Sequence, residues 1–94
     1  MILPVLNALA EPTRLGAIRI LADGGEHCVC ELMVRLHATQ SRMSRHMSVL
    51  RNAGLVRDRR DAQWVRYRLN LDLQPELRAV LDAVLASEPK EQAA

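Results

Sequence analysis

Apolar residues at helical spacing predict two helices in the first quarter of the chain. The first helix is marked by a stripe of four side chains, Ile2, Val5, Leu6 and Leu9. The second is expected to begin at Pro12, because proline lacks an N–H and that group is unpaired at the first position of a helix in any case. It is expected to end at Asp23-Gly24-Gly25, a sequence that favours a turn.

Two more helices, separated by a short turn, are predicted between Cys28 and Gly54. The third begins at Cys28, which takes the place of a capping Ser or Thr, and Glu31 is expected to reach back to the N–H of that residue. His37-Ala38 forms the turn, and Thr39 caps the fourth helix. Two helices joined in this way, the second with a polar face, are typical of a helix-turn-helix that binds DNA.

The pattern changes from helical to alternating after Gly54. Residues 56–60 and 64–69 predict the two strands of a short hairpin, joined around Asp61-Ala62-Gln63. A last helix opens at Pro75, and its apolar stripe extends to Leu85. The predicted order, α-α-α-α-β-β-α, is that of a mostly α winged helix-turn-helix, formed by residues 1–94 as a single domain with a polar tail over about residues 87–94.

Positive charge is concentrated in the predicted fourth helix and hairpin. Residues 40–69 hold eight arginines and two acidic residues, whereas the rest of the chain holds five basic and nine acidic residues. Such asymmetry is what a localised surface for a polyanion requires. The composition elsewhere is aliphatic, since Trp64 and Tyr67 are the only aromatic residues among 94. A chain this small commonly gains buried area by forming an oligomer.

The segment rich in arginine predicts contacts with double-stranded DNA. Seven residues on the polar side of the fourth helix and on the hairpin are expected to take part: Gln40, Ser41, Ser44, Arg45, His46, Arg59 and Arg60. Arg45 is expected to contact guanine and Gln40 adenine, while Arg59 and Arg60 are expected to contact phosphates or the minor groove. For His46, phosphate contact and packing are equally open.

Several classes of protein are not supported by the sequence. No apolar run approaches the ~18 residues of a membrane span, and no signal-peptide pattern opens the chain, so a cytoplasmic protein is expected. No paired carboxylates, nucleophile–base pair or phosphate-binding loop indicates an enzyme.

The two cysteines, Cys28 and Cys30, are separated by one residue at the start of the predicted third helix. Neighbours this close are poor material for a structural disulfide, and in a reducing cytoplasm they are expected to be free thiols or ligands of a soft ion. Residues two apart in a regular helix point to nearly opposite sides. Both sulfurs are therefore expected to bind one ion only if the first helical turn loosens.

Several motifs, in order, resemble the ArsR/SmtB family of winged helix-turn-helix repressors. They are Leu9-Ala10-Glu11-Pro12-Thr13-Arg14, Cys28-Val29-Cys30-Glu31-Leu32, Ser44-Arg45-His46-Met47-Ser48-Val49-Leu50-Arg51 and Gly54-Leu55-Val56. Residues 63–69 look like the second wing strand of the arsenical-resistance branch. The resemblance covers roughly residues 6–70.

The resemblance implies a homodimeric repressor that leaves an inverted-repeat operator when arsenite or antimonite binds Cys28 and Cys30. It implies pairing through the first and last helices, whose apolar residues are Ile2, Val5, Leu6, Leu77, Val80, Leu81, Val84 and Leu85. Many arsenic sensors of this type have a third cysteine three residues after the second, where this chain has Met33. A small-molecule thiol or hydroxide then fills the third site, or two thiolates suffice.

Two other functions would use the same residues. A repressor that responds to oxidants or reactive sulfur would lose DNA binding with those reagents but not with arsenite. A DNA-binding module without regulatory cysteines would be unaffected by their replacement. His27, beside Cys28, is open to a role as a ligand or base, although an exposed loop histidine is expected, and His37 is expected to be structural.

Overall fold

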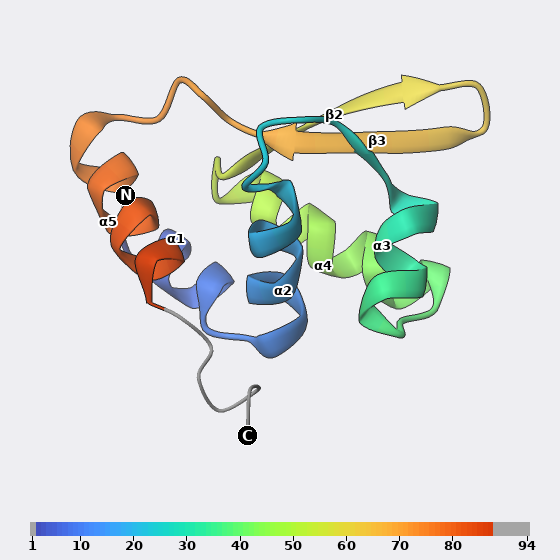
Figure 1. Cartoon of the computed structure of the whole chain (residues 1–94), viewed down its shortest axis with the longest axis horizontal. Helices are drawn as coiled ribbons and strands as arrows, with labels where there is room; N and C mark the ends of the chain where they lie inside the picture. The colour runs from blue at the N-terminus through green and yellow to red at the C-terminus, as the bar shows by residue number, and fades with distance from the viewer. Residues whose placement is uncertain (1, 88–94) are drawn as a thin grey trace.

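The computed structural model describes residues 2–87, and within that range it contains five helices and one three-stranded antiparallel sheet (Figure 1). The helices are α1 (Ile2–Leu9), α2 (Pro12–Leu21), α3 (Val29–Leu36), α4 (Gln40–Asn52) and α5 (Pro75–Ala86), and the strands are β1 (His27–Cys28), β2 (Val56–Asp61) and β3 (Trp64–Leu69). This order confirms the predicted winged helix-turn-helix. Residues 88–94 of the predicted polar tail lie outside the described residues. No helix in residues 2–87 is long and apolar enough to cross a membrane.

Capping chemistry sets the helix boundaries. The side chain of Glu11 accepts a hydrogen bond from the N–H of Arg14 at the start of α2, at 2.8 Å. Thr39 caps α4 as predicted, because its hydroxyl accepts from the N–H of Arg42 at 3.3 Å. His37 ends α3 in the left-handed conformation, with φ 56°. Its structural role at the turn is therefore confirmed.

The core is built from aliphatic and thioether side chains of all five helices and of the sheet. Its fully buried members include Ile18, Leu21, Leu32, Met43, Met47, Leu50 and Leu55. Val5 and Leu81, with 0% and 1% of their surface exposed, also belong to it. This corrects their assignment to a dimer surface, because a side chain buried within one protomer has almost no area to offer a partner.

The sheet contains a strand that the sequence pattern does not predict. β1 has only two residues, and it pairs with β3 on the side opposite β2, with His27 across from Tyr67 and Cys28 across from Arg66. β2 and β3 form the predicted hairpin. A two-residue strand has no alternation to detect. Through its pairing with β3, strand β1 joins the cysteine motif directly to the wing.

The elements divide the molecule into two ends. Figure 1 shows α1 and α5 at one end and α3 at the other, with α2 and α4 between them and the hairpin along one side. α4 packs against α1, α2, α3 and β2. The helix expected to read DNA is therefore held by most of the fold.

Candidate DNA interface and thiol site

Cys28 and Cys30 are joined by a disulfide at the N-terminus of α3. Cys28 is the N-cap and has an extended backbone, with φ −67° and ψ 144°, whereas Cys30 lies in the first helical turn. The two Cα atoms are 5.1 Å apart, and the sulfurs are bonded while α3 keeps its first turn. The expectation that neighbours this close would not form a disulfide was therefore wrong. The opposite-sides rule applies only where both residues are helical, and Cys28 is the extended N-cap. The loosening of the first turn when both sulfurs bind one ion stays a prediction.

The sulfur of Cys28 also replaces the hydroxyl of a usual cap. It accepts a hydrogen bond from the N–H of Cys30 at 3.1 Å. Cys28 is 7% exposed and Cys30 is half-buried. Capping by Cys28 is thus confirmed, and the pair lies at the edge of the core.

His27 lies between two carboxylates, and this corrects the expectation of an exposed loop histidine. Its side chain is 12% exposed, with Nε2 2.8 Å from Asp23 and Nδ1 2.9 Å from Glu31. Glu31 also accepts from Arg35, so it does not close the predicted capping box. Among residues 2–87, no group of three or more His, Cys, Asp or Glu side chains is arranged to hold a metal ion.

The charges around His27 change its titration. Burial lowers its pKa, but the hydrogen bonds to Glu31 and Asp23 outweigh burial, and the pKa is raised overall. The pKa of Glu31 is lowered by its hydrogen bonds from His27 and Arg35. The two carboxylates thus stabilise the protonated form of the imidazole immediately before Cys28.

Half of the arginines predicted to attract DNA are engaged within the protein. Four of the eight form ion pairs, Arg51 with Asp58, Arg57 with Asp72, Arg59 with Glu26 and Arg66 with Asp61. Arg59 pairs through both Nε and Nη2, at 2.9 and 2.7 Å. The pair lowers the pKa of Glu26. Arg59 thus links the residue before β1 to the wing, and its contact with DNA stays a prediction.

The remaining arginines form no ion pair with any described residue, and they include two on α4. These are Arg42, Arg45, Arg60 and Arg68, all exposed. Gln40 and Ser41 are also exposed on α4, while Ser44 and His46 are half-buried. Arg42 was missed as a DNA-binding candidate, although its position three residues before Arg45 places the two on one side of the helix.

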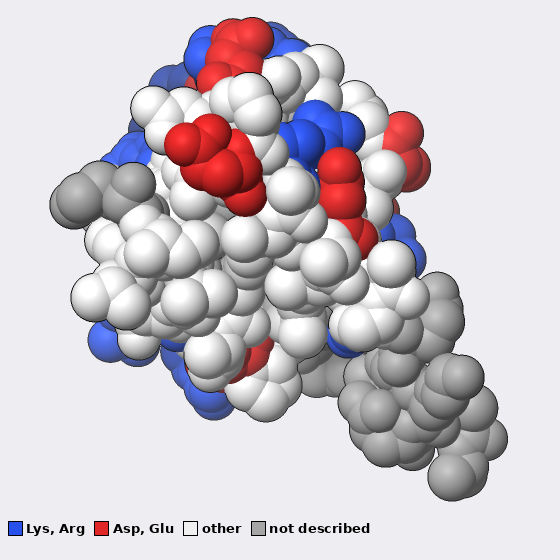
Figure 2. Space-filling model, turned by 90° about the vertical axis from the view of Figure 1, so that its left-hand side faces the viewer, with Lys and Arg blue, Asp and Glu red and all other residues white. Residues whose placement is uncertain are grey.

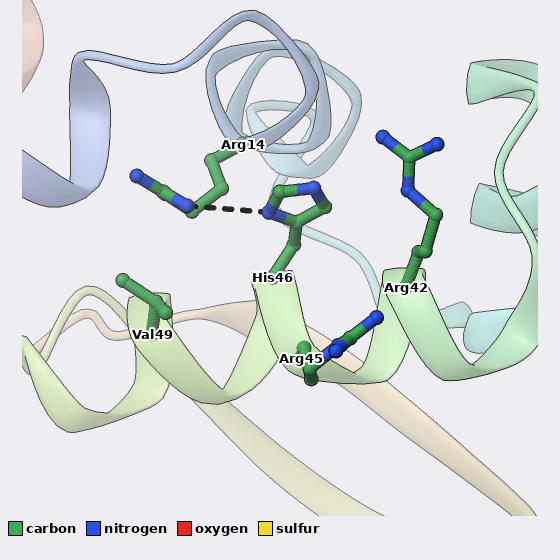
Figure 3. Close-up of a pocket in the computed structure, with 5 residues that line it drawn as sticks. All are labelled: Arg14, Arg42, Arg45, His46 and Val49. Atoms are coloured by element: carbon green, nitrogen blue, oxygen red, sulfur yellow. Dashed lines mark hydrogen bonds between the residues drawn. The ribbon is translucent and has the colours of Figure 1, made fainter.

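A hollow of about 270 Å³ lies between α2 and α4, lined by Arg14, Arg42, Arg45, His46 and Val49 (Figure 3). Nη1 of Arg14 lies 3.2 Å from Nδ1 of His46. The sequence pattern predicts no DNA contact for Arg14, because the residue that it contacts, His46, is 32 positions away in the chain. Arg14 of α2 thus extends the basic surface formed by α4.

Comparison with known proteins places this geometry in a family. A family model described as "Bacterial regulatory protein, arsR family" matches residues 11–58. The arsenic resistance transcriptional regulator ArsR2 of Pseudomonas putida is 44% identical over 81 residues, which cover 86% of this chain and 70% of that protein. The arsenical resistance operon repressor of Escherichia coli is 44% identical over 71 residues, covering 73% of this chain and 61% of the relative.

A solved structure of a winged helix-turn-helix protein is similar to this chain in fold, in agreement with the relatives that are similar in sequence. The homodimeric winged helix-turn-helix DNA-binding domain Mb0332 of Mycobacterium bovis has a TM-score of 0.75 and 25% identity, over 90% of this chain and 75% of that chain. Its fold confirms the architecture described above. The chain belongs to the arsR family of bacterial regulatory proteins, and it is a transcriptional regulator and not an enzyme.

Proposed function

We propose that this protein is a homodimeric repressor that releases operator DNA when trivalent arsenic or antimony binds the thiolates of Cys28 and Cys30. The observation that carries the proposal is the meeting of both sulfurs where α3 joins the sheet. The names of the relatives from Pseudomonas putida and Escherichia coli support a metalloid as the inducer.

The reduced pair has the chemistry that a soft metalloid requires. Thiolates are the preferred ligands of soft ions, and a helix N-terminus favours the negative charge. Arsenite, As(OH)3, would exchange two hydroxides for the two sulfurs, releasing two waters and keeping one hydroxide as its third ligand. Both ring nitrogens of the neighbouring His27 already face carboxylates, and this favours hydroxide as the third ligand.

The position of the pair gives the inducer two routes to the DNA-binding elements. Cys30 belongs to α3, the first helix of the helix-turn-helix, and Cys28 is paired with Arg66 of the wing strand. A metalloid held between the sulfurs would favour one arrangement of these elements. A preference of a few kcal/mol for the DNA-free arrangement is enough to change operator occupancy.

The apolar end of the molecule supports the proposed dimer. Figure 2 shows a broad uncharged area on the face that carries α1 and α5. Three large apolar side chains of α1 are exposed, Ile2 at 41%, Leu3 at 73% and Leu6 at 45%. A twofold dimer would place two α4 helices about 34 Å apart, which suits an inverted repeat.

The test is fluorescence anisotropy of a labelled duplex that the wild-type protein has enriched from a random-sequence library. Under reducing conditions, micromolar arsenite is expected to release the wild type but not Cys28→Ser, Cys30→Ser or the double variant. Met33→Leu is the matched control, because it removes the other nearby sulfur of α3, and it should respond as the wild type does. Release of the double variant by arsenite would contradict the proposal.

The disulfide itself favours a second candidate, a repressor that responds to oxidants or reactive sulfur. Its formation removes two protons and two electrons from the thiol pair, and a peroxide that accepts them is reduced to water. The same duplex distinguishes the two candidates. Release of the wild type by hydrogen peroxide or polysulfide, with no effect of arsenite on the reduced protein, would select the second.

A further inference from the structure

We infer that Arg14, Arg42, Arg45 and His46 form a binding site for one phosphodiester group of the DNA backbone, with Arg14 positioning His46 as a hydrogen-bond donor. The inference rests on the proposed function, because it assigns a ligand to a hollow on the same DNA-binding surface. It adds Arg14 of α2 and Arg42 of α4 to Arg45 and His46, because the sequence pattern predicted DNA contacts only for the latter two.

The lining of the hollow suits an acceptor that carries negative charge. Three of its five residues are arginines and none is acidic, and guanidinium groups bind phosphate through charge-assisted hydrogen bonds. Arg42 and Arg45 form no ion pair with any residue of the described range, so their donors are available to a ligand. The volume of about 270 Å³ accommodates a phosphate group together with ordered water.

Arg14 fixes which nitrogen of His46 carries the hydrogen. A guanidinium has only donors, so the Nδ1 atom of His46, 3.2 Å from Nη1, must accept. The hydrogen of the neutral ring then lies on Nε2, which faces the side of the hollow where Arg42 stands (Figure 3). Glu11 approaches the same Nδ1 atom, at 3.8 Å. With this tautomer, the polar groups that line the hollow and remain open to a ligand are guanidinium N–H groups and Nε2–H of His46, all of them donors.

Arg14 is itself held in place by the end of α1. Its Nε donates to the carbonyl of Ala8 at 2.8 Å, and Nη2 donates to the carbonyl of Asn7 at 3.2 Å. Its backbone N–H is bound by Glu11. The relay from Arg14 to His46 is thus formed before DNA arrives, and less side-chain freedom is lost on binding.

DNA is the source of the phosphate because the hollow opens beside exposed residues of α4. A residue that contacts a backbone phosphate carries no sequence information, and its loss weakens binding to all sequences alike. A free oxyanion such as inorganic phosphate has the same chemistry, and it is the alternative that the experiment must exclude.

The test is the salt dependence of binding to the enriched duplex and to a scrambled duplex of the same length. Arg42→Gln is expected to reduce the slope of log K against log salt by about 1.8 on both duplexes, which is the value for one phosphate contact in each of the two protomers. His46→Leu should weaken binding to both duplexes, and His46→Gln should restore it, because the amide can accept from Arg14 and still donate. Arg78→Gln on α5 is the control, since it removes the same charge outside the hollow and should leave the slope unchanged.

The positioning role of Arg14 has its own readout. Nitrogen-15 NMR of the DNA-free wild type should place the hydrogen of His46 on Nε2, and the opposite tautomer would overturn the relay. If the wild type binds no duplex, the proposed function fails. If it binds but Arg42→Gln and His46→Leu match Arg78→Gln, only the phosphate site fails. Saturable binding of inorganic phosphate with unchanged slopes would assign the hollow to a free oxyanion instead.

Discussion

At the scale of the residue, the pKa of His27 differs from that of a free histidine because two neighbouring carboxylates contact its ring. The two carboxylates stabilise the imidazolium more than burial destabilises it. Arg35 lies beyond Glu31 and lowers the pKa of that carboxyl further. The result is a compact group of alternating charges beside the thiol pair.

This arrangement predicts how stability depends on pH. The folded-state pKa of His27 is raised above its ordinary value of 6.5, so its ion pairs stabilise the fold below that pH, and the contribution is lost as the pH rises through the raised pKa. Urea unfolding between about pH 6 and pH 8 should show a decrease in the free energy of unfolding, and His27→Gln should flatten it. The same substitution at His46 serves as the control and should retain the decrease. A His27→Gln profile equal to that of the wild type would contradict the assignment.

At the scale of the element, two features at the ends of α3 and α4 position the candidate sites. β1 connects the start of α3 to the wing strand, and Glu26 adds a bidentate ion pair with Arg59 of β2. Gly54 separates α4 from β2. Its φ of 84° lets the N–H of Leu55 bond the carbonyl of Leu50 and close the helix.

Gly54 gives a prediction in which backbone conformation is the only variable. A Cβ at this position would meet no atom within 4 Å, so Gly54→Ala should destabilise the fold by about 1 kcal/mol through its left-handed backbone alone. Gly25→Ala is the matched control, because Gly25 does not have a positive φ, and its effect should be within about 0.5 kcal/mol. Chemical denaturation of both variants measures the difference, and equal effects would argue against backbone strain as the cause.

At the scale of the whole molecule, the exposed apolar side chains of α1 determine the expected assembly. Leu6 is 45% exposed at the end that carries α1 and α5, whereas Val34 is 74% exposed on α3. We expect Leu6→Glu to shift the protein to a monomer in sedimentation velocity and to weaken operator binding, because each protomer would then contact one half-site. Val34→Glu places the same charge on a more exposed apolar residue and should leave the dimer intact. A dimeric Leu6→Glu protein would exclude this end as the interface.

The sequence alone was sufficient for the order of helices and hairpin, the cap of α4 by Thr39 and the turn at His37. These features depend on contacts within a few residues, which apolar spacing and capping preferences report directly. The concentration of arginine on α4 and the wing was equally visible, because it is a property of composition.

Only the tertiary structure decided which of these groups act together. The pairing of Arg59 with Glu26 and of Arg14 with His46 joins residues 33 and 32 positions apart, and no local pattern reports such distances. The meeting of Cys28 and Cys30 depended on the extended backbone of β1, whose pairing with β3 is itself a long-range contact. Local periodicity thus determined the elements, while the packing of distant segments determined which charges and sulfurs remain available for function.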